Sequence, residues 1–112
     1  MIATELPIKH CVNSKHPSLP GHFPGQPIVP GVVILNSVFK QLAAEFPEQR
    51  ICGIKKLKFL RPLLPDQVFT ISHDGIKNGG LRFKCWLTHT DTLMAEGHLK
   101  LHPLEFSTNP MS

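Results

Sequence analysis

The sequence predicts an α+β fold in which an antiparallel sheet wraps around one long helix. Residues 32–46 read VVILNSVFKQLAAEF, a single helix-like segment that ends before Pro47. Segments with a two-residue alternation follow it, separated by turn residues such as Asn78-Gly79-Gly80. One helix followed by a run of hairpin-linked strands is typical of an α+β domain.

The chain before this helix contains one short strand and one stiff loop. Leu6–Val12 alternates in part and is expected to form a strand. Residues 14–29 are rich in proline, which fixes φ and lacks a backbone N–H, so they cannot form a central strand. The helix should begin near Pro30, because proline is tolerated in the first turn.

The helix itself is apolar around most of its circumference. Ser37, Gln41 and Glu45, spaced four apart, make its one consistent polar stripe. A helix that is apolar nearly all round is expected to be buried. Asn36 then lies on an apolar face, where an amide is costly unless it has hydrogen-bond partners. Its apolar neighbours on that face are Val32, Val33, Phe39 and Ala43.

The second half of the chain should form the sheet. Phe69, Ile71 and His73 share one face of their strand, and Asn78-Gly79-Gly80 predicts a tight hairpin. All 112 residues are expected to form a single domain with a loose tail over about 103–112. The predicted strands are Arg50–Phe59, Gln67–Lys77, Leu81–Thr90 and Thr92–Leu101, with a turn over Arg61–Asp66.

Composition narrows the possible environments and partners. No apolar run approaches the ~20 residues needed to span a bilayer, and the first residues do not resemble a signal peptide. Three lone cysteines, expected to be small buried side chains, indicate a reducing cytoplasm. A net charge of +4, with one tryptophan and no tyrosine, does not indicate nucleic-acid binding. The basic run Lys55–Arg61 is interpreted as a solvated strand face.

Two residues next to the prolines could carry chemistry. His22 lies within the stiff segment GHFPG, which could hold an imidazole in the fixed position that a general base needs. Gly31 opens the helix, where unpaired N–H groups could bind a thioester carbonyl oxygen. An equally good explanation is that Gly31 eases a tight turn between loop and helix.

The segment GHFPGQPIVPGVVIL resembles the signature of the FabA/FabZ family of 3-hydroxyacyl-(acyl carrier protein) dehydratases. Gly21 to Gly31 meet the family pattern G-H-F-x-G-x-P-x-x-P-G in full, and the resemblance extends over most of residues 5–101. It implies the hotdog fold, with His22 removing the α-proton and Gly31 binding the thioester carbonyl. Phe23 and Val32, in the same segment, are expected to contact the substrate.

The chain departs from that pattern at Asn36, fourteen positions after the histidine, where the family has Glu or Asp. A carboxylic acid can protonate the departing hydroxyl, whereas a neutral amide cannot. Asn36 could instead donate a hydrogen bond to the hydroxyl or hold a water, and a purely structural amide is equally possible.

A metal site is not expected. His98 and His102 would lie roughly 13 Å apart in a strand, and the other histidines form no HxH or HExxH pattern.

Three functions are compatible with these residues. The first is a dehydratase without a cofactor, acting on chains carried by the phosphopantetheine of acyl carrier protein or by coenzyme A. The resemblance implies at least a homodimer, and an acidic carrier protein would suit the basic run. The second is a hotdog thioesterase, and the third is a non-catalytic thioester-binding subunit.

Overall fold

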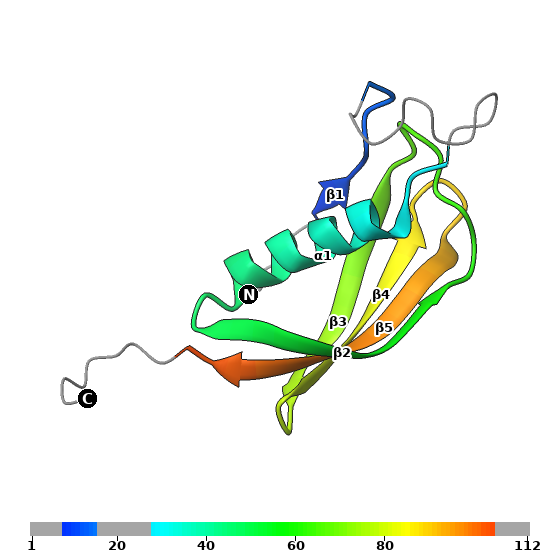
Figure 1. Ribbon diagram of the computed structural model, residues 1–112. Helices are drawn as coiled ribbons and strands as arrows, with labels where there is room; N and C mark the ends of the chain where they lie inside the picture. Colours follow the sequence, from blue (N-terminus) through cyan, green and yellow to red (C-terminus); the bar gives the residue numbers. More distant parts are fainter. Residues whose placement is uncertain (1–7, 16–27, 105–112) are drawn as a thin grey trace, which may run out of the picture.

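The α+β architecture is confirmed by the computed structural model, which describes residues 8–15 and 28–104. Helix α1 (Gly31–Glu45) lies across the concave side of an antiparallel sheet (Figure 1). The sheet has the order β1-β3-β4-β5-β2, so the strand that follows the helix pairs with the last strand and lies at an edge. Its strands are β1 (Lys9–His10), β2 (Gln49–Phe59), β3 (Phe69–Lys77), β4 (Gly80–Leu87) and β5 (Thr92–Pro103).

The predicted helix boundaries are confirmed. Pro30 is the N-cap, with an extended backbone, and its carbonyl accepts the first helical hydrogen bonds. The last turn closes when the Phe46 N–H donates to the Leu42 carbonyl, at 2.8 Å, just before Pro47. Within the described residues, no helix is both long and apolar enough to cross a membrane.

The hairpin between β3 and β4 is also confirmed. Asn78 and Gly79 both have positive φ, 52° and 75°, as the tight type I′ turn requires. The first strand is shorter than predicted, because only Lys9 and His10 of the described residues pair with β3. The tail prediction is corrected for residues 103 and 104, since Pro103 ends β5 and the Leu104 N–H donates to the Glu48 backbone carbonyl at 2.8 Å.

The core lies between the helix and the concave face of the sheet. Cys85 is buried there, as expected, but the same expectation was wrong for Cys11 and Cys52, which are exposed. Cys11 follows the last paired residue of β1, and Cys52 lies at an irregularity of the β2–β5 ladder. The largest fully buried side chains are Val38, Leu42, Leu63, Phe69, Leu81, Phe83, Cys85, Met94 and Leu99.

The prediction that α1 is buried all round is wrong for this chain. One sheet covers one stripe of the helix, which buries Ile34, Val38 and Leu42. The opposite side remains open, with Val32 70% exposed and Asn36 also exposed. Asn36 therefore needs no protein partner to satisfy its amide, because water reaches it.

Candidate functional site

A groove of about 500 Å³ lies at the start of α1. One wall is the segment that leads into the helix, and the other is the chain that leaves β2. A hydrogen bond from the Val29 N–H to the Leu63 carbonyl, at 2.8 Å, holds the two walls together. The lining is mostly apolar and comprises Ile28, Val29, Pro30, Gly31, Ile34, Phe59, Leu60, Arg61, Pro62 and Leu63.

Gly31 lies directly against the ring of Phe59. A Cβ built on Gly31 would lie 2.6 Å from the Cζ atom of Phe59, closer than real side chains pack. Gly31 is not among the glycines with positive φ, so the backbone conformation does not require glycine there. The glycine is therefore explained by the close approach of Phe59 rather than by a tight turn.

The groove ends at the positive end of the helix dipole. The Pro30 carbonyl accepts hydrogen bonds from Val33 and Ile34, which leaves the N–H groups of Gly31 and Val32 without intrahelical acceptors. The first turn of α1 contains no acidic residue that would offset the dipole, and Arg61 adds a cationic side chain. Such a site can stabilise negative charge that develops on a carbonyl oxygen.

The other predicted site residues divide into two groups. His22 and Phe23 lie outside the described residues. Val32 and Asn36 are one helical turn apart on the open side of α1. The structure therefore brings Gly31, Val32 and Asn36 to the N-terminal half of one helix, but it does not bury the amide as the sequence predicted.

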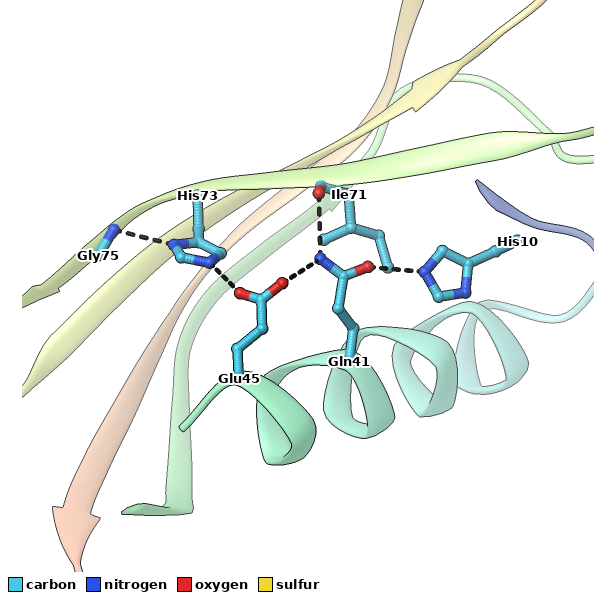
Figure 2. A network of polar contacts seen from close by, with 6 residues as sticks. All are labelled: His10, Gln41, Glu45, Ile71, His73 and Gly75. Atoms are coloured by element: carbon cyan, nitrogen blue, oxygen red, sulfur yellow. Dashed lines mark hydrogen bonds and ion pairs between the residues drawn. The ribbon is translucent and has the colours of Figure 1, made fainter. Parts of the chain in front are cut away.

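A polar network between α1 and the sheet was not anticipated (Figure 2). Gln41 is only 6% exposed and donates from its amide nitrogen to Glu45 Oε2 at 3.0 Å and to the Ile71 carbonyl at 3.3 Å. His73 and Glu45 contact each other at 2.5 Å, and His10 lies 2.7 Å from the Gln41 oxygen. Gln41 and Glu45 of the polar stripe therefore contact β1 and β3, and Gln41 is buried by these contacts while Glu45 stays partly exposed.

The partners fix the direction of these hydrogen bonds. The Gly75 N–H donates to His73 Nδ1 at 2.9 Å, so His73 carries its proton on Nε2 and donates to Glu45. Gln41 uses its amide nitrogen as a donor, so its oxygen accepts from His10 Nε2. Since both ring nitrogens of His73 are engaged, the network serves to join the helix to the sheet.

A signal for this network was present in the sequence. His73 alternates with Phe69 and Ile71, so it shares the face of β3 that packs toward the helix. Gln41 and Glu45 are four residues apart and therefore lie on one side of α1. The sequence does not show that α1 lies against β3, so these two patterns alone could not predict that Glu45 contacts His73.

Among residues 8–15 and 28–104, no Asp or Glu lines the groove. Glu96 pairs in register with Lys58 and Lys84, whereas Asp66 lies in a turn and accepts from the Ser14 N–H at 3.2 Å. In the part of the chain that the structure describes, no cluster of three or more His, Cys, Asp or Glu could hold a metal ion.

Comparison with known proteins identifies the relatives of this chain. A model of the ApeI-like family, described as ApeI dehydratase, matches residues 3–98. The 3-hydroxyacyl-[acyl-carrier-protein] dehydratase FabZ of Klebsiella pneumoniae is 34% identical over 85 residues, which cover 65% of this chain and 56% of the relative. FabZ of Koribacter versatilis is 43% identical over 58 residues, which cover 43% of this chain and 37% of that protein. The chain thus spans about half or less of the length of these curated relatives.

A solved structure agrees with these sequence matches. The dehydratase heterocomplex ApeI:P from Xenorhabdus doucetiae matches with a TM-score of 0.69 and 27% identity, over 83% of this chain and 82% of that one. The hotdog fold implied by the motif is thereby confirmed, as is the resemblance to FabZ-like dehydratases. Because the family model covers most of its residues, the chain belongs to the ApeI-like dehydratase family.

Proposed function

We propose that this protein dehydrates 3-hydroxyacyl thioesters carried by the phosphopantetheine of an acyl carrier protein or by coenzyme A. The observation that carries the proposal is the apolar groove at the N-terminus of α1, which ends at the Gly31 and Val32 N–H groups that have no intrahelical acceptor. The match to FabZ enzymes supports the same reaction class. The groove is mostly apolar, which suits an acyl chain better than a polar substrate.

The proposed reaction needs one base and one polarised carbonyl. His22 takes the α-proton while the Gly31 N–H stabilises the negative charge on the thioester oxygen. The bond between C3 and its hydroxyl oxygen then breaks, a C2–C3 double bond forms, and the oxygen leaves with a proton as water. Asn36 donates a hydrogen bond to the leaving oxygen, and His22 returns the proton, so no redox cofactor is required.

We also propose that the site is completed in an oligomer, at least a homodimer. Val32 and Asn36 are exposed on the side of α1 that the sheet leaves open. At the edge strand β2, Ile54 and Phe59 are also exposed. Exposed apolar side chains beside an edge strand favour cover by another chain.

A second candidate is a subunit that binds the thioester and depends on a partner for the acid. Two observations favour it: the absence of a carboxylate at position 36, and the similarity to a chain of a dehydratase heterocomplex. A hotdog thioesterase is a third possibility, because an exposed asparagine could orient a water for hydrolysis.

One substrate separates the three functions. Purified protein is mixed with a 3-hydroxyacyl thioester of pantetheine, and enoyl absorbance and free thiol are followed together. Enoyl formation supports the dehydratase, thiol release supports the thioesterase, and binding without either product supports the accessory subunit.

Two substitutions test the proposed roles. His22→Ala should abolish dehydration, whereas His89→Ala, in the exposed turn before β5, should leave it unchanged. Asn36→Glu should raise the rate, since a positioned acid contributes typically ~10²–10⁴-fold. Ala44→Glu adds the same charge at an exposed position of α1 and should not. A slower Asn36→Glu variant would show that the asparagine has a role of its own.

A further inference from the structure

The connection between β2 and β3 contacts the chain on both sides of residues 16–27. On the entry side, the Asp66 N–H donates to the Val12 carbonyl at 2.7 Å. On the exit side, the Val29 N–H donates to the Leu63 carbonyl at 2.8 Å. Val12, Val29 and Leu63 are all buried, and the three segments meet at one end of the sheet (Figure 1). One short connection therefore holds two parts of the chain that are distant in sequence.

The connection is itself fixed to the sheet at both of its ends. The N–H groups of Leu60 and Arg61 both donate to the Met94 carbonyl of β5, at 2.8 and 3.2 Å. At the other end, the Thr88 N–H donates to the Val68 carbonyl at 3.0 Å. A segment tied to a sheet in this way can place the chain that it contacts, as a rigid scaffold places a functional loop.

Asp66 occupies the third position of a turn within this connection. Pro65 precedes it, Asp66 has a φ of 70°, and the Gln67 N–H donates to the Leu64 carbonyl at 3.2 Å, as in a type II turn. Glycine would adopt that positive φ with less strain than aspartate. The carboxylate has a use of its own, because Asp66 Oδ1 accepts a hydrogen bond from the Ser14 N–H at 3.2 Å.

We propose that Asp66 is a positioning residue for His22. This role rests on the proposed function, in which His22 takes the α-proton. Asp66 holds the chain that enters residues 16–27 by two hydrogen bonds, one from its N–H and one to its carboxylate. A segment held at both ends has fewer conformations than one held at a single end. The imidazole is therefore within reach of the α-proton for a larger fraction of the time, and the rate of proton transfer depends on that fraction.

The position of Asp66 predicts which kinetic constant it affects. Asp66 does not line the groove at Gly31, whereas Leu63 does. Loss of the Asp66 carboxylate should therefore leave substrate binding in the groove intact and lower the rate of the bound complex. We expect a lower kcat with a nearly unchanged KM, the effect of losing an interaction that matters only in the transition state.

The test compares two substitutions of Asp66 with a matched control, using a 3-hydroxyacyl thioester of pantetheine. Asp66→Gly keeps the positive φ and the N–H to Val12 but removes the acceptor for Ser14, so kcat should fall about threefold to tenfold. Asp66→Asn keeps an oxygen acceptor and tolerates positive φ, so it should retain about half or more of the native kcat. Asp91→Gly makes the same change at an exposed residue with a φ of 54° and should leave kcat unchanged.

A second measurement does not depend on turnover. Trypsin cleaves after Lys15, which directly follows Ser14 and is exposed, so the rate of that cut reports how often this end of the segment is released. Asp66→Gly should speed the cut about threefold to tenfold, as located by mass spectrometry. Asp66→Asn and Asp91→Gly should leave it close to the native rate.

The inference is overturned if Asp66→Gly keeps the native kcat, or if Asp91→Gly lowers kcat as much. It is equally overturned if Asp66→Asn loses as much activity as Asp66→Gly, or if the loss appears in KM rather than in kcat. If the native protein forms no enoyl product, the proposed function is wrong. An unchanged rate of cleavage after Lys15 in Asp66→Gly would show separately that the Asp66 carboxylate does not hold this end of the segment.

Discussion

Replacing Gln41 by leucine tests the polar network between α1 and the sheet. The substitution keeps a side chain of similar size but removes the donor to the Ile71 carbonyl, a contact that is buried. An unsatisfied buried carbonyl costs about 1–3 kcal/mol. The bond to Glu45 adds little, because that carboxylate is 33% exposed and can be solvated. We therefore expect Gln41→Leu to lower the free energy of unfolding by about 1–3 kcal/mol.

Urea denaturation at one fixed protomer concentration measures this loss, since oligomerisation makes apparent stability depend on concentration. Ser37→Ala, one turn earlier on the same stripe, is the matched control and should change stability by less than about 0.5 kcal/mol. If Gln41→Leu is as stable as the native protein, the hydrogen bond to the Ile71 carbonyl does not stabilise the fold, and the proposed role of the network in holding α1 against the sheet is wrong.

Four further outcomes are expected. Gly31→Ala should displace the Phe59 ring and so raise the KM for the thioester, which steady-state kinetics would measure. Adding Phe59→Leu should lower that KM part of the way back. If the double variant shows no such recovery, the steric explanation is wrong. Burial raises the pKa of the Cys85 thiol to about 12, so it should stay unreactive to a disulfide reagent while the exposed cysteines react. The unfolded thiol ionises first, so the free energy of unfolding should fall as pH rises above 9.0, the ordinary pKa of a thiol, and Cys85→Ser should flatten that slope. For His98, whose pKa is lowered by desolvation and by nearby cations, Arg82→Gln should raise the midpoint of its NMR titration; an unchanged midpoint would refute the assigned cause.

The sequence predicted correctly those features that depend on residues close together in the chain. Pro30 and Pro47 mark the two ends of α1, because proline has no backbone N–H to donate to the preceding turn of a helix. Asn78-Gly79 predicted the hairpin because both residues adopt positive φ. The motif from Gly21 to Gly31 indicated the dehydratase family, and the family model agrees.

The hydrophobic pattern of α1 did not predict correctly which of its side chains are buried, because their burial depends on which side of the helix the sheet covers. The nearly continuous apolar pattern predicted a helix that is buried all round, including the face with Val32 and Asn36. The structure buries one side, where the polar Gln41 packs against β3, and it leaves Val32 and Asn36 open. A helical pattern gives the relative angles of its side chains, but only the neighbouring sheet sets which angle faces inward.

The sequence by itself determined the element order, the hairpin and the family, because these follow from backbone chemistry and from a contiguous motif. Tertiary structure alone decided that Phe59 closes against Gly31, that two histidines join one network, and that the β2–β3 connection holds the chain on both sides of residues 16–27. Each of these joins residues far apart in the chain, and such contacts depend on sheet order and register, which the alternation of side chains does not encode.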